Sequence, residues 1–172
     1  AYEIFDSPGD AYAYLESAEF PIVLKADGLA LGKGVLICQN LEEARDGVRT
    51  IMEDKQFGTA GNRLVIEEFM TGREVSVLSF VDGAAIKTMT SAQDHKRAGD
   101  GDAGPNTGGM GTFSPSPFYT EEIDAYCRKY IYQPTVDAMA AEGREFKGII
   151  FFGLMLTEKG PRVLEYNVRF GD

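Results

Sequence analysis

Histidine and cysteine are scarce in this sequence of 172 residues, which has one histidine, His95, and two cysteines, Cys38 and Cys127. A single histidine argues against both a histidine-rich metal site and a Ser-His-Asp triad. The two cysteines lie far apart in the sequence, in apolar segments that we expect to form a strand and a helix. We therefore expect buried free thiols and a cytoplasmic protein, because the cytoplasm keeps thiols reduced.

The sequence also lacks any apolar run near the roughly 20 residues of a membrane span, and its start does not resemble a signal peptide. Basic residues are outnumbered, since 17 of them against 27 acidic residues give a formal net charge of −10. This balance argues against a nucleic-acid backbone or an anionic membrane as partner. It does not exclude a nucleotide, because a local group of lysines and arginines is enough to meet the phosphates.

The composition present is that of a globular protein, with 44% hydrophobic and 26% charged residues. The length fits one domain of ordinary size or a piece of something larger, and it can bury a core. Apolar spacing predicts helices over residues 8–20, 41–52 and 120–143, the last interrupted at Pro134. Their predicted N-caps are Ser7, Asn40 and Thr120, and Glu43 completes an approximate capping box with Asn40. Strands are predicted over residues 22–24, 35–37, 64–67, 74–81, 85–89, 148–156 and 163–168. Residues 90–117 form a polar, glycine-rich passage without periodicity, and such passages are usually functional or disordered.

A glycine-spaced segment, residues 21–35, joins two of these predicted strands. We expect Lys25 near one end of the turn and Lys33 near the other. Glycine lets the backbone approach a ligand, and exposed N–H groups with two ammonium groups suit a polyphosphate. The glycine spacing fits neither a Walker loop nor a Rossmann fingerprint. An ordinary glycine hairpin with solvated lysines explains the segment equally well.

A hinge-like segment, residues 65–74, includes the end of the predicted strand that carries Glu67 and the residues after it. Where a strand ends before a glycine turn, its backbone N–H and C=O groups can pair with the edge of a flat heterocycle. Glu74, a few residues further on, is a candidate ligand for ribose hydroxyls. Taken alone, this segment is better explained as a hairpin with solvated glutamates.

Polar residues alternate along the final predicted strand. Glu165, Asn167 and Arg169 are expected on one face, and the other face carries Leu164, Tyr166 and Val168. A carboxylate, an amide oxygen and a guanidinium in one row suit Mg²⁺ and phosphates, because Mg²⁺ takes oxygen ligands. The polar side of a half-exposed strand is at least as good an explanation of these residues alone.

The passage over residues 91–111 contains His95, Lys96 and Arg97, followed by the glycine-rich run GPNTGGMG. Its amide and hydroxyl groups could surround a small polar substrate, and its basic side chains could meet a phosphate. A solvated loop is the commoner setting for such a histidine.

Taken together, these segments resemble the phosphoribosylamine–glycine ligases (glycinamide ribonucleotide synthetases), a family of the ATP-grasp superfamily. The resemblance covers residues 20–172 and rests on PIVLKADGLALGKGV, VIEEFMTGRE, SAQDHKRAGDGDAGPNTGGMG and LEYNVRFGD, in that order. The third segment is the most specific of the four. The resemblance implies an α+β ATP-grasp fold, with antiparallel sheets, flanking helices and an ATP site held between two subdomains.

The implied reaction is ATP-dependent ligation of glycine to 5-phosphoribosylamine in purine biosynthesis. A glycyl phosphate forms, and the amine attacks it to give glycinamide ribonucleotide, ADP and phosphate. The implied cofactor is Mg²⁺ or Mn²⁺, and the implied partners are ATP, glycine and 5-phosphoribosylamine, with no nucleic acid and no membrane.

The resemblance also implies a role for individual residues. Lys25 and Lys33 fall at the ATP phosphates, with Lys33 and Arg169 as the catalytic candidates. Residues at the adenine and ribose are Glu67, Phe69, Met70 and Glu74. Glu165 and Asn167 match the metal ligands. The second substrate is assigned to Lys96, Arg97, Asn106, Thr107, Gly108 and Gly109.

Residues 1–89 are expected to form the nucleotide-binding subdomain, and residues 90–172 the substrate loop with part of the catalytic subdomain. The family enzyme is considerably longer at both ends, so we expect a fragment, truncated at both ends and inactive in isolation. Residues 151–156 carry no acidic residue, although ATP-grasp enzymes often place a further metal carboxylate there. Two alternatives remain open: a different ATP-grasp carboxylate–amine ligase, which should lack the GPNTGGMG run, and a non-catalytic nucleotide-binding module.

Overall fold

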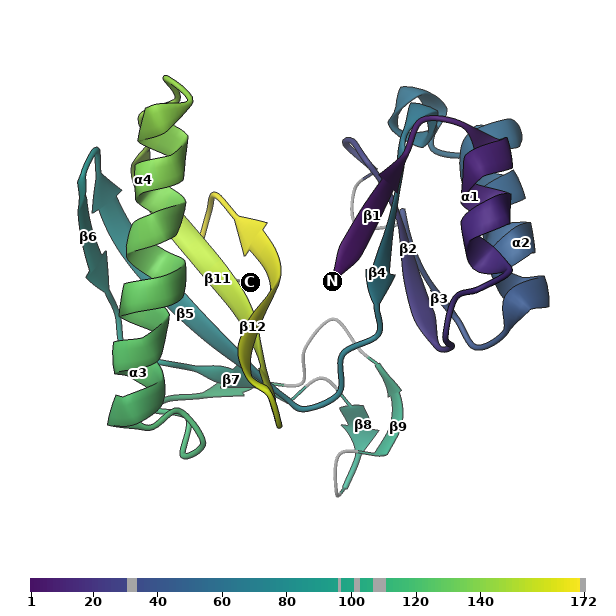
Figure 1. The fold of residues 1–172 in the computed structure, drawn as a ribbon. Helices are drawn as coiled ribbons and strands as arrows, with labels where there is room; N and C mark the ends of the chain where they lie inside the picture. The colour runs from purple at the N-terminus through teal and green to yellow at the C-terminus, as the bar shows by residue number, and fades with distance from the viewer. Residues whose placement is uncertain (31–33, 96, 101–102, 107–110, 171–172) are drawn as a thin grey trace. The chain divides into compact units, whose positions relative to one another are not determined.

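The computed structural model describes residues 1–30, 34–95, 97–100, 103–106 and 111–170. The chain divides into two compact units, Ala1–Phe69 and Met70–Asp172. Each unit contains a four-stranded antiparallel sheet with helices on one of its faces (Figure 1). The predicted α+β class with antiparallel sheets and flanking helices is confirmed.

The first unit has a sheet in the order β1-β4-β2-β3 and two helices. Its elements are β1 (Tyr2–Phe5), α1 (Pro8–Leu15), β2 (Ile22–Ala26), β3 (Val35–Cys38), α2 (Leu41–Val48) and β4 (Leu64–Glu68). A π-helical turn, Arg49–Glu53, continues α2, and a 3₁₀ turn, Gly58–Asn62, precedes β4.

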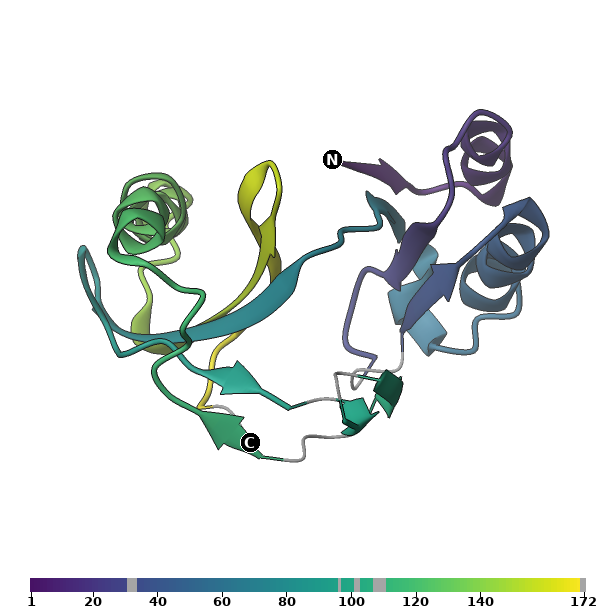
Figure 2. The same cartoon turned by 90° about the horizontal axis from the view of Figure 1, so that it is seen from below.

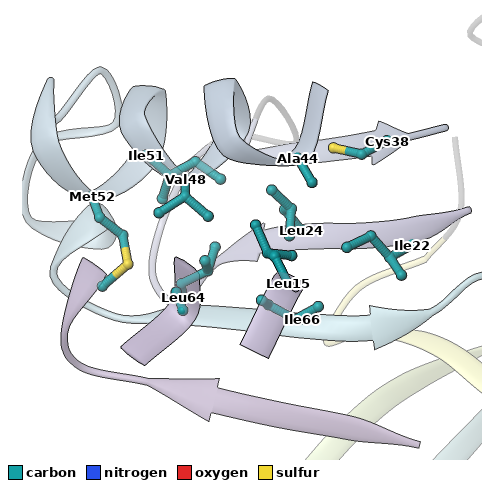
Figure 3. Packing of buried hydrophobic residues seen from close by; sticks show 11 residues of the cluster. Leu15, Ile22, Leu24, Cys38, Ala44, Val48, Ile51, Met52, Leu64 and Ile66 are labelled. Carbon is teal, nitrogen blue, oxygen red and sulfur yellow. The ribbon is translucent and has the colours of Figure 1, made fainter. Parts of the chain in front are cut away.

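Alternation along the strands decides which face of the first sheet is buried. Ile22, Leu24, Leu64 and Ile66 lie in one apolar core with residues of α1 and α2 (Figure 3). Because successive strand residues point to opposite faces, the residues between them face away from the helices. Lys25 and Glu67, which were assigned to the nucleotide from the sequence, directly follow Leu24 and Ile66 and lie on that other face.

The predicted caps are largely present in the structure. Asn40 Oδ1 accepts from the Glu43 N–H at 3.0 Å, and the Glu43 carboxylate accepts from the Gln39 N–H at 2.8 Å. This arrangement confirms the approximate capping box of α2. Ser7 is the N-cap residue of α1, but its side chain makes no capping hydrogen bond.

The second unit has a sheet in the order β12-β11-β5-β6, and its helices lie on one face (Figure 2). The main elements are β5 (Arg73–Asp82), β6 (Ala85–Thr88), α3 (Glu121–Cys127), α4 (Gln133–Ala141), β11 (Lys147–Thr157) and β12 (Gly160–Asn167). Thr120 caps α3 as predicted, accepting from the Ile123 N–H at 3.3 Å.

The interruption expected at Pro134 is a π-helical turn, Arg128–Tyr132, that joins α3 to α4. Proline has no N–H to donate, and the wider π turn just before it accommodates the missing hydrogen bond. The core of this unit packs helix residues such as Tyr132 and Val136 against Val77, Phe152 and Leu154 of the sheet.

The passage expected to lack regular structure contains four short strands, which pair as β7 (Gln93–Asp94) with β10 (Thr112–Phe113) and β8 (Arg97–Gly99) with β9 (Ala103–Asn106). Its base is held by side-chain hydrogen bonds. Ser91 Oγ accepts from the Ser116 N–H at 3.2 Å, and Ser116 Oγ donates to Gln93 Oε1 at 3.0 Å. Both serines are buried, so the ends of this passage are part of the folded unit.

The unit boundary in sequence falls between Phe69 and Met70. It precedes β5 because β5 pairs with β11 from Arg73 to Asp82, within the sheet of the second unit. The functional division into residues 1–89 and 90–172 stays a prediction. Among the helices that the structure describes, none is long and apolar enough to cross a membrane.

Candidate functional site

Lys25 and Glu67 form an ion pair on the open face of the first sheet. Lys25 Nζ lies 2.6 Å from Glu67 Oε2, and the two side chains are 27% and 25% exposed. They are diagonal neighbours across β2 and β4, because Val23 pairs with Glu67 and Lys25 pairs with Val65. The structure therefore brings together two residues that the sequence assigned to different parts of ATP, the phosphates and the adenine.

Apolar side chains surround this ion pair on the same face. Tyr2 is the register partner of Glu67, and Val35 is the register partner of Lys25. Large apolar residues exposed on this face are Tyr2, Ile4, Val35 and Ile37. An apolar surface with one charged pair suits a flat ring that carries polar groups at its edge.

Tyr2 and Ile4 were not predicted as site residues, because β1 was not predicted from the sequence. The alternation in YEIF was the available signal. A run of four residues carries little weight until its partner, here β4, is known.

The glycine-spaced segment, residues 21–35, joins the strands β2 and β3 as predicted, and these two strands form an antiparallel pair. At its base the Ala26 N–H donates to Gly34 O at 2.9 Å, and the Asp27 N–H donates to Arg63 O at 3.0 Å. Lys33 lies outside the described residues. Lys25 lies on β2 itself, so its position is set by the sheet.

The hinge-like segment joins the two units. Phe69 is the last residue of the first unit, and Met70 is the first residue of the second. Residues 69–72 lie outside helices and strands. Glu74 lies near the start of β5, is exposed, and has Met155 as its register partner.

Glu165 and Asn167 lie side by side on β12. Asn167 Nδ2 donates to Glu165 Oε1 at 3.3 Å, so the two side chains share one face of the strand. Tyr166 between them packs against Phe152 of the buried core, with ring centroids 5.6 Å apart. Glu165 and Asn167 therefore lie on the face of the second sheet that the helices do not cover.

Of the three polar residues expected to share a strand face, only Glu165 and Asn167 lie on β12. β12 stops at Asn167, and Arg169 lies in a bend beyond it, where its Nη1 donates to Phe170 O at 2.7 Å. The expectation that Arg169 continues the strand row is therefore wrong, because the sheet pairing ends at the register pair of Phe151 and Asn167.

The donor set fits a divalent cation of the Mg²⁺ type. A carboxylate and an amide oxygen are hard ligands, and Mg²⁺ commonly takes one or two protein oxygens and completes its shell with phosphate and water. Among the described residues, no group of three or more His, Cys, Asp or Glu side chains could hold a metal ion. A site at Glu165 and Asn167 would need further oxygen ligands, of the kind that phosphate and water supply.

The residues expected at the second substrate are described only in part. Arg97 and Asn106 are register partners in the β8–β9 hairpin. Lys96, Thr107, Gly108 and Gly109 lie outside the described residues. His95 is exposed and stacks on Phe113 with ring centroids 4.9 Å apart.

The two cysteines are buried and free, as predicted. Burial raises the pKa of Cys38 to about 11 and also raises the pKa of Cys127. Both thiols therefore stay protonated at neutral pH, which makes them poor nucleophiles.

Comparison with known proteins gives a consistent result. The family described as phosphoribosylglycinamide synthetase, ATP-grasp (A) domain, matches residues 1–172. The chain is 51% identical to the trifunctional purine biosynthetic protein adenosine-3 of Gallus gallus, over 99% of this chain and 17% of that protein. It is 49% identical to the phosphoribosylamine–glycine ligase of Xanthomonas campestris, over 99% of this chain and 40% of that protein.

A crystal structure of phosphoribosylamine–glycine ligase from Thermotoga maritima is similar with a TM-score of 0.87 and 34% identity. The match covers 100% of this chain and 44% of that one. The chain thus spans less than half the length of each of these relatives.

Proposed function

The chain belongs to the phosphoribosylglycinamide synthetase ATP-grasp (A) domain family, and from this premise we propose that it is the ATP- and metal-binding part of a phosphoribosylamine–glycine ligase. The observation that carries the proposal is 49% identity over 99% of the chain to a relative with that name. The pairing of Glu165 with Asn167 on an open sheet face supports it.

The proposed reaction has two steps. A carboxylate oxygen of glycine attacks the γ-phosphorus of ATP, the bond to the β–γ bridging oxygen breaks, and ADP leaves. The amine of 5-phosphoribosylamine then attacks the carbonyl carbon of the glycyl phosphate and loses a proton. The carbon–oxygen bond to the phosphate breaks, giving the amide of glycinamide ribonucleotide and inorganic phosphate.

Glu165 and Asn167 are the metal ligands in this proposal. When bound, Mg²⁺ or Mn²⁺ neutralises charge on the transferring phosphoryl group and orients the phosphates. Glu165 supplies a full negative charge and Asn167 a neutral oxygen, so the pair holds a dication without neutralising it. The remaining positive charge stays available to the phosphate oxygens.

In this proposal the nucleotide is ATP. Lys25 and Lys33 meet the phosphates, and Glu67 with the backbone of Phe69 and Met70 meets the adenine. Lys25 is close to Glu67, so binding requires it to exchange or share that carboxylate with a phosphate oxygen. Glu74 holds the ribose hydroxyls.

The catalytic candidates are Lys33 and Arg169, whose positive charges oppose the negative charge that develops during phosphoryl transfer. Residues 1–89 form the nucleotide-binding part in this proposal, and residues 90–172 form the substrate loop and part of the catalytic half. The second substrate is bound by Lys96, Arg97 and residues 106–109. The protein acts in the cytoplasm.

The test is ADP release by the ligase that contains this chain. We expect release to require both glycine and 5-phosphoribosylamine, and to be accompanied by an equal amount of glycinamide ribonucleotide. Glu165→Gln is the control that removes the proposed metal carboxylate. ADP release with a different amine or a different carboxylate would favour another ATP-grasp ligase, and nucleotide binding without ADP release would favour a non-catalytic module.

A further inference from the structure

Gly153 lies beside Glu165 in the second sheet. It is in the centre of β11, where its register partners are Glu165 on β12 and Ser76 on β5. Direct partners in an antiparallel sheet point to the same face. A side chain at residue 153 would therefore stand between Ser76 and Glu165, on the face that carries the proposed metal ligands.

The Glu165 side chain occupies the space that a residue other than glycine would need. A Cβ atom at residue 153 would lie 2.9 Å from Glu165 Cγ and 3.3 Å from Phe151 Cε1. Contacts below about 3.0 Å require movement, and Glu165 Cγ is the atom that a rotation of χ1 moves. The carboxylate would move with it.

Gly153 is not required by its backbone conformation. The described glycines with positive φ are Gly58, Gly72, Gly83, Gly111, Gly143, Gly148 and Gly160, and Gly153 is not among them. Alanine can therefore adopt the same backbone without φ strain. What glycine provides at residue 153 is space for Glu165.

A β-bulge coincides with this position. Gly153 pairs with Glu165 but Leu154 pairs with Val163, so Leu164 is an extra residue in β12. The bulge reverses the alternation of β12, because Val163 contacts the buried core while Glu165, two residues later, faces the open side. Bulges commonly redirect a side chain in this way next to active sites.

Contacts on the helix-covered face of the sheet also hold β12 in place. Tyr166 packs against Phe152, which in turn packs against Tyr132 with tilted rings and centroids 4.6 Å apart. The Tyr166 hydroxyl lies 3.4 Å from Thr135 Oγ1. The backbone of β12 therefore has little freedom to move away from a new side chain, and the Glu165 side chain must move instead.

We propose that Gly153 is a positioning residue for the metal site, whose missing side chain lets Glu165 point beside Asn167. The proposal rests on the proposed function for the assignment of Glu165 as a metal ligand. Residues that orient metal ligands typically change metal affinity by about 10- to 100-fold when they are replaced. A positioning role therefore predicts a large metal effect without loss of the fold.

The first experiment measures Mn²⁺ binding by electron paramagnetic resonance, with the ligase that contains this chain and a non-hydrolysable ATP analogue. We expect Gly153→Ala to weaken Mn²⁺ binding about tenfold. The matched control is Ile150→Val on the same strand, because Ile150 is buried on the helix face. This control should bind Mn²⁺ like the wild type.

The results distinguish the proposed metal site from the proposed positioning role of Gly153. If the wild type binds Mn²⁺ no better than Glu165→Gln, the metal site of the proposed function is wrong. If the wild type binds better than Glu165→Gln and Gly153→Ala matches the wild type, the positioning role of Gly153 is wrong.

A double-mutant cycle tests the same contact without metal. Alanine at residue 165 has no Cγ, so Gly153→Ala should lower the apparent melting temperature in the wild-type background and leave it unchanged or higher in the Glu165→Ala background. The double variant remains measurable even if Gly153→Ala alone folds poorly. An equal loss in both backgrounds would overturn the proposal, because the cost would then not arise from Glu165.

Discussion

Lys25 Nζ and Glu67 Oε2 lie 2.6 Å apart on the open face of the first sheet, with both side chains about one quarter exposed. The pair joins a candidate phosphate ligand to a candidate adenine residue. Tyr2 is the register partner of Glu67, and Val35 is the register partner of Lys25, so the pair has apolar neighbours on this face. A nucleotide binding there would meet an ammonium group that the sheet has already positioned.

Replacing Lys25 should therefore weaken nucleotide binding. We expect Lys25→Met to lower the affinity for an ATP analogue at least about tenfold, or roughly 1.4 kcal/mol, because it removes a positive charge from the phosphate contact. Isothermal titration calorimetry measures the affinity. The control is Arg45→Met, which also breaks a described ion pair, with Glu16, but on the helix side of the unit. Equal affinities in both variants would contradict the role of Lys25.

Replacing Glu165 should affect turnover more than nucleotide affinity. In Glu165→Gln the metal loses a charged ligand where the transferring phosphoryl group develops negative charge, whereas the adenine and ribose contacts remain. We expect a fall in kcat of about 100-fold or more, at most a few-fold change in analogue affinity, and a higher Mg²⁺ requirement. Steady-state kinetics across Mg²⁺ concentrations measure this. Glu158→Gln, in the turn of the same hairpin, should behave like the wild type, and a normal kcat in Glu165→Gln would contradict the assignment.

The two faces of the second sheet should differ in their contribution to stability. Phe152 is fully buried and Phe80 is 53% exposed. We expect Phe152→Ala to lower the free energy of unfolding by about 3–5 kcal/mol, because it leaves a cavity. Phe80→Ala should cost much less, about 1 kcal/mol or below. Denaturant unfolding compares the two variants, and similar costs would show that the assignment of the faces is wrong.

The buried thiols should be unreactive in the folded state. Burial raises the pKa of Cys38 from 9.0 to about 11, so the folded state binds the thiol proton more tightly than the unfolded state. Proton binding by Cys38 therefore contributes to the free energy of unfolding. This contribution is fully present below about pH 9 and is lost as the pH rises to about 11. A thiol reagent at neutral pH should label Cys38 and Cys127 only after unfolding. Above pH 9, the free energy of unfolding should fall less in Cys38→Ala than in the wild type, because the variant lacks the Cys38 thiol. Rapid labelling of the native protein would contradict the burial argument.

Local signals in the sequence predicted much of the fold. Asn40 and Glu43 marked the start of α2, and the alternation after Leu164 placed Glu165 and Asn167 on one face. These signals depend on neighbours within a few residues, and the sequence contains those neighbours.

Features that depend on distant partners were not predictable in the same way. β1 exists because it pairs with β4, more than 50 residues away. The Lys25–Glu67 contact depends on the register of β2 against β4, and the bulge at Leu164 depends on the register of β11 against β12. The role of Gly153 follows from that register, since the sequence alone does not show which residue lies beside Glu165.

We propose that a ligase containing this chain activates glycine as an acyl phosphate. The most direct measurement uses glycine labelled with ¹⁸O in its carboxylate, together with ATP and 5-phosphoribosylamine, and determines the isotope content of the phosphate by mass spectrometry. We expect each inorganic phosphate to carry one ¹⁸O atom, because the oxygen that attacks the γ-phosphorus leaves with it. Unlabelled phosphate formed together with glycinamide ribonucleotide would contradict it.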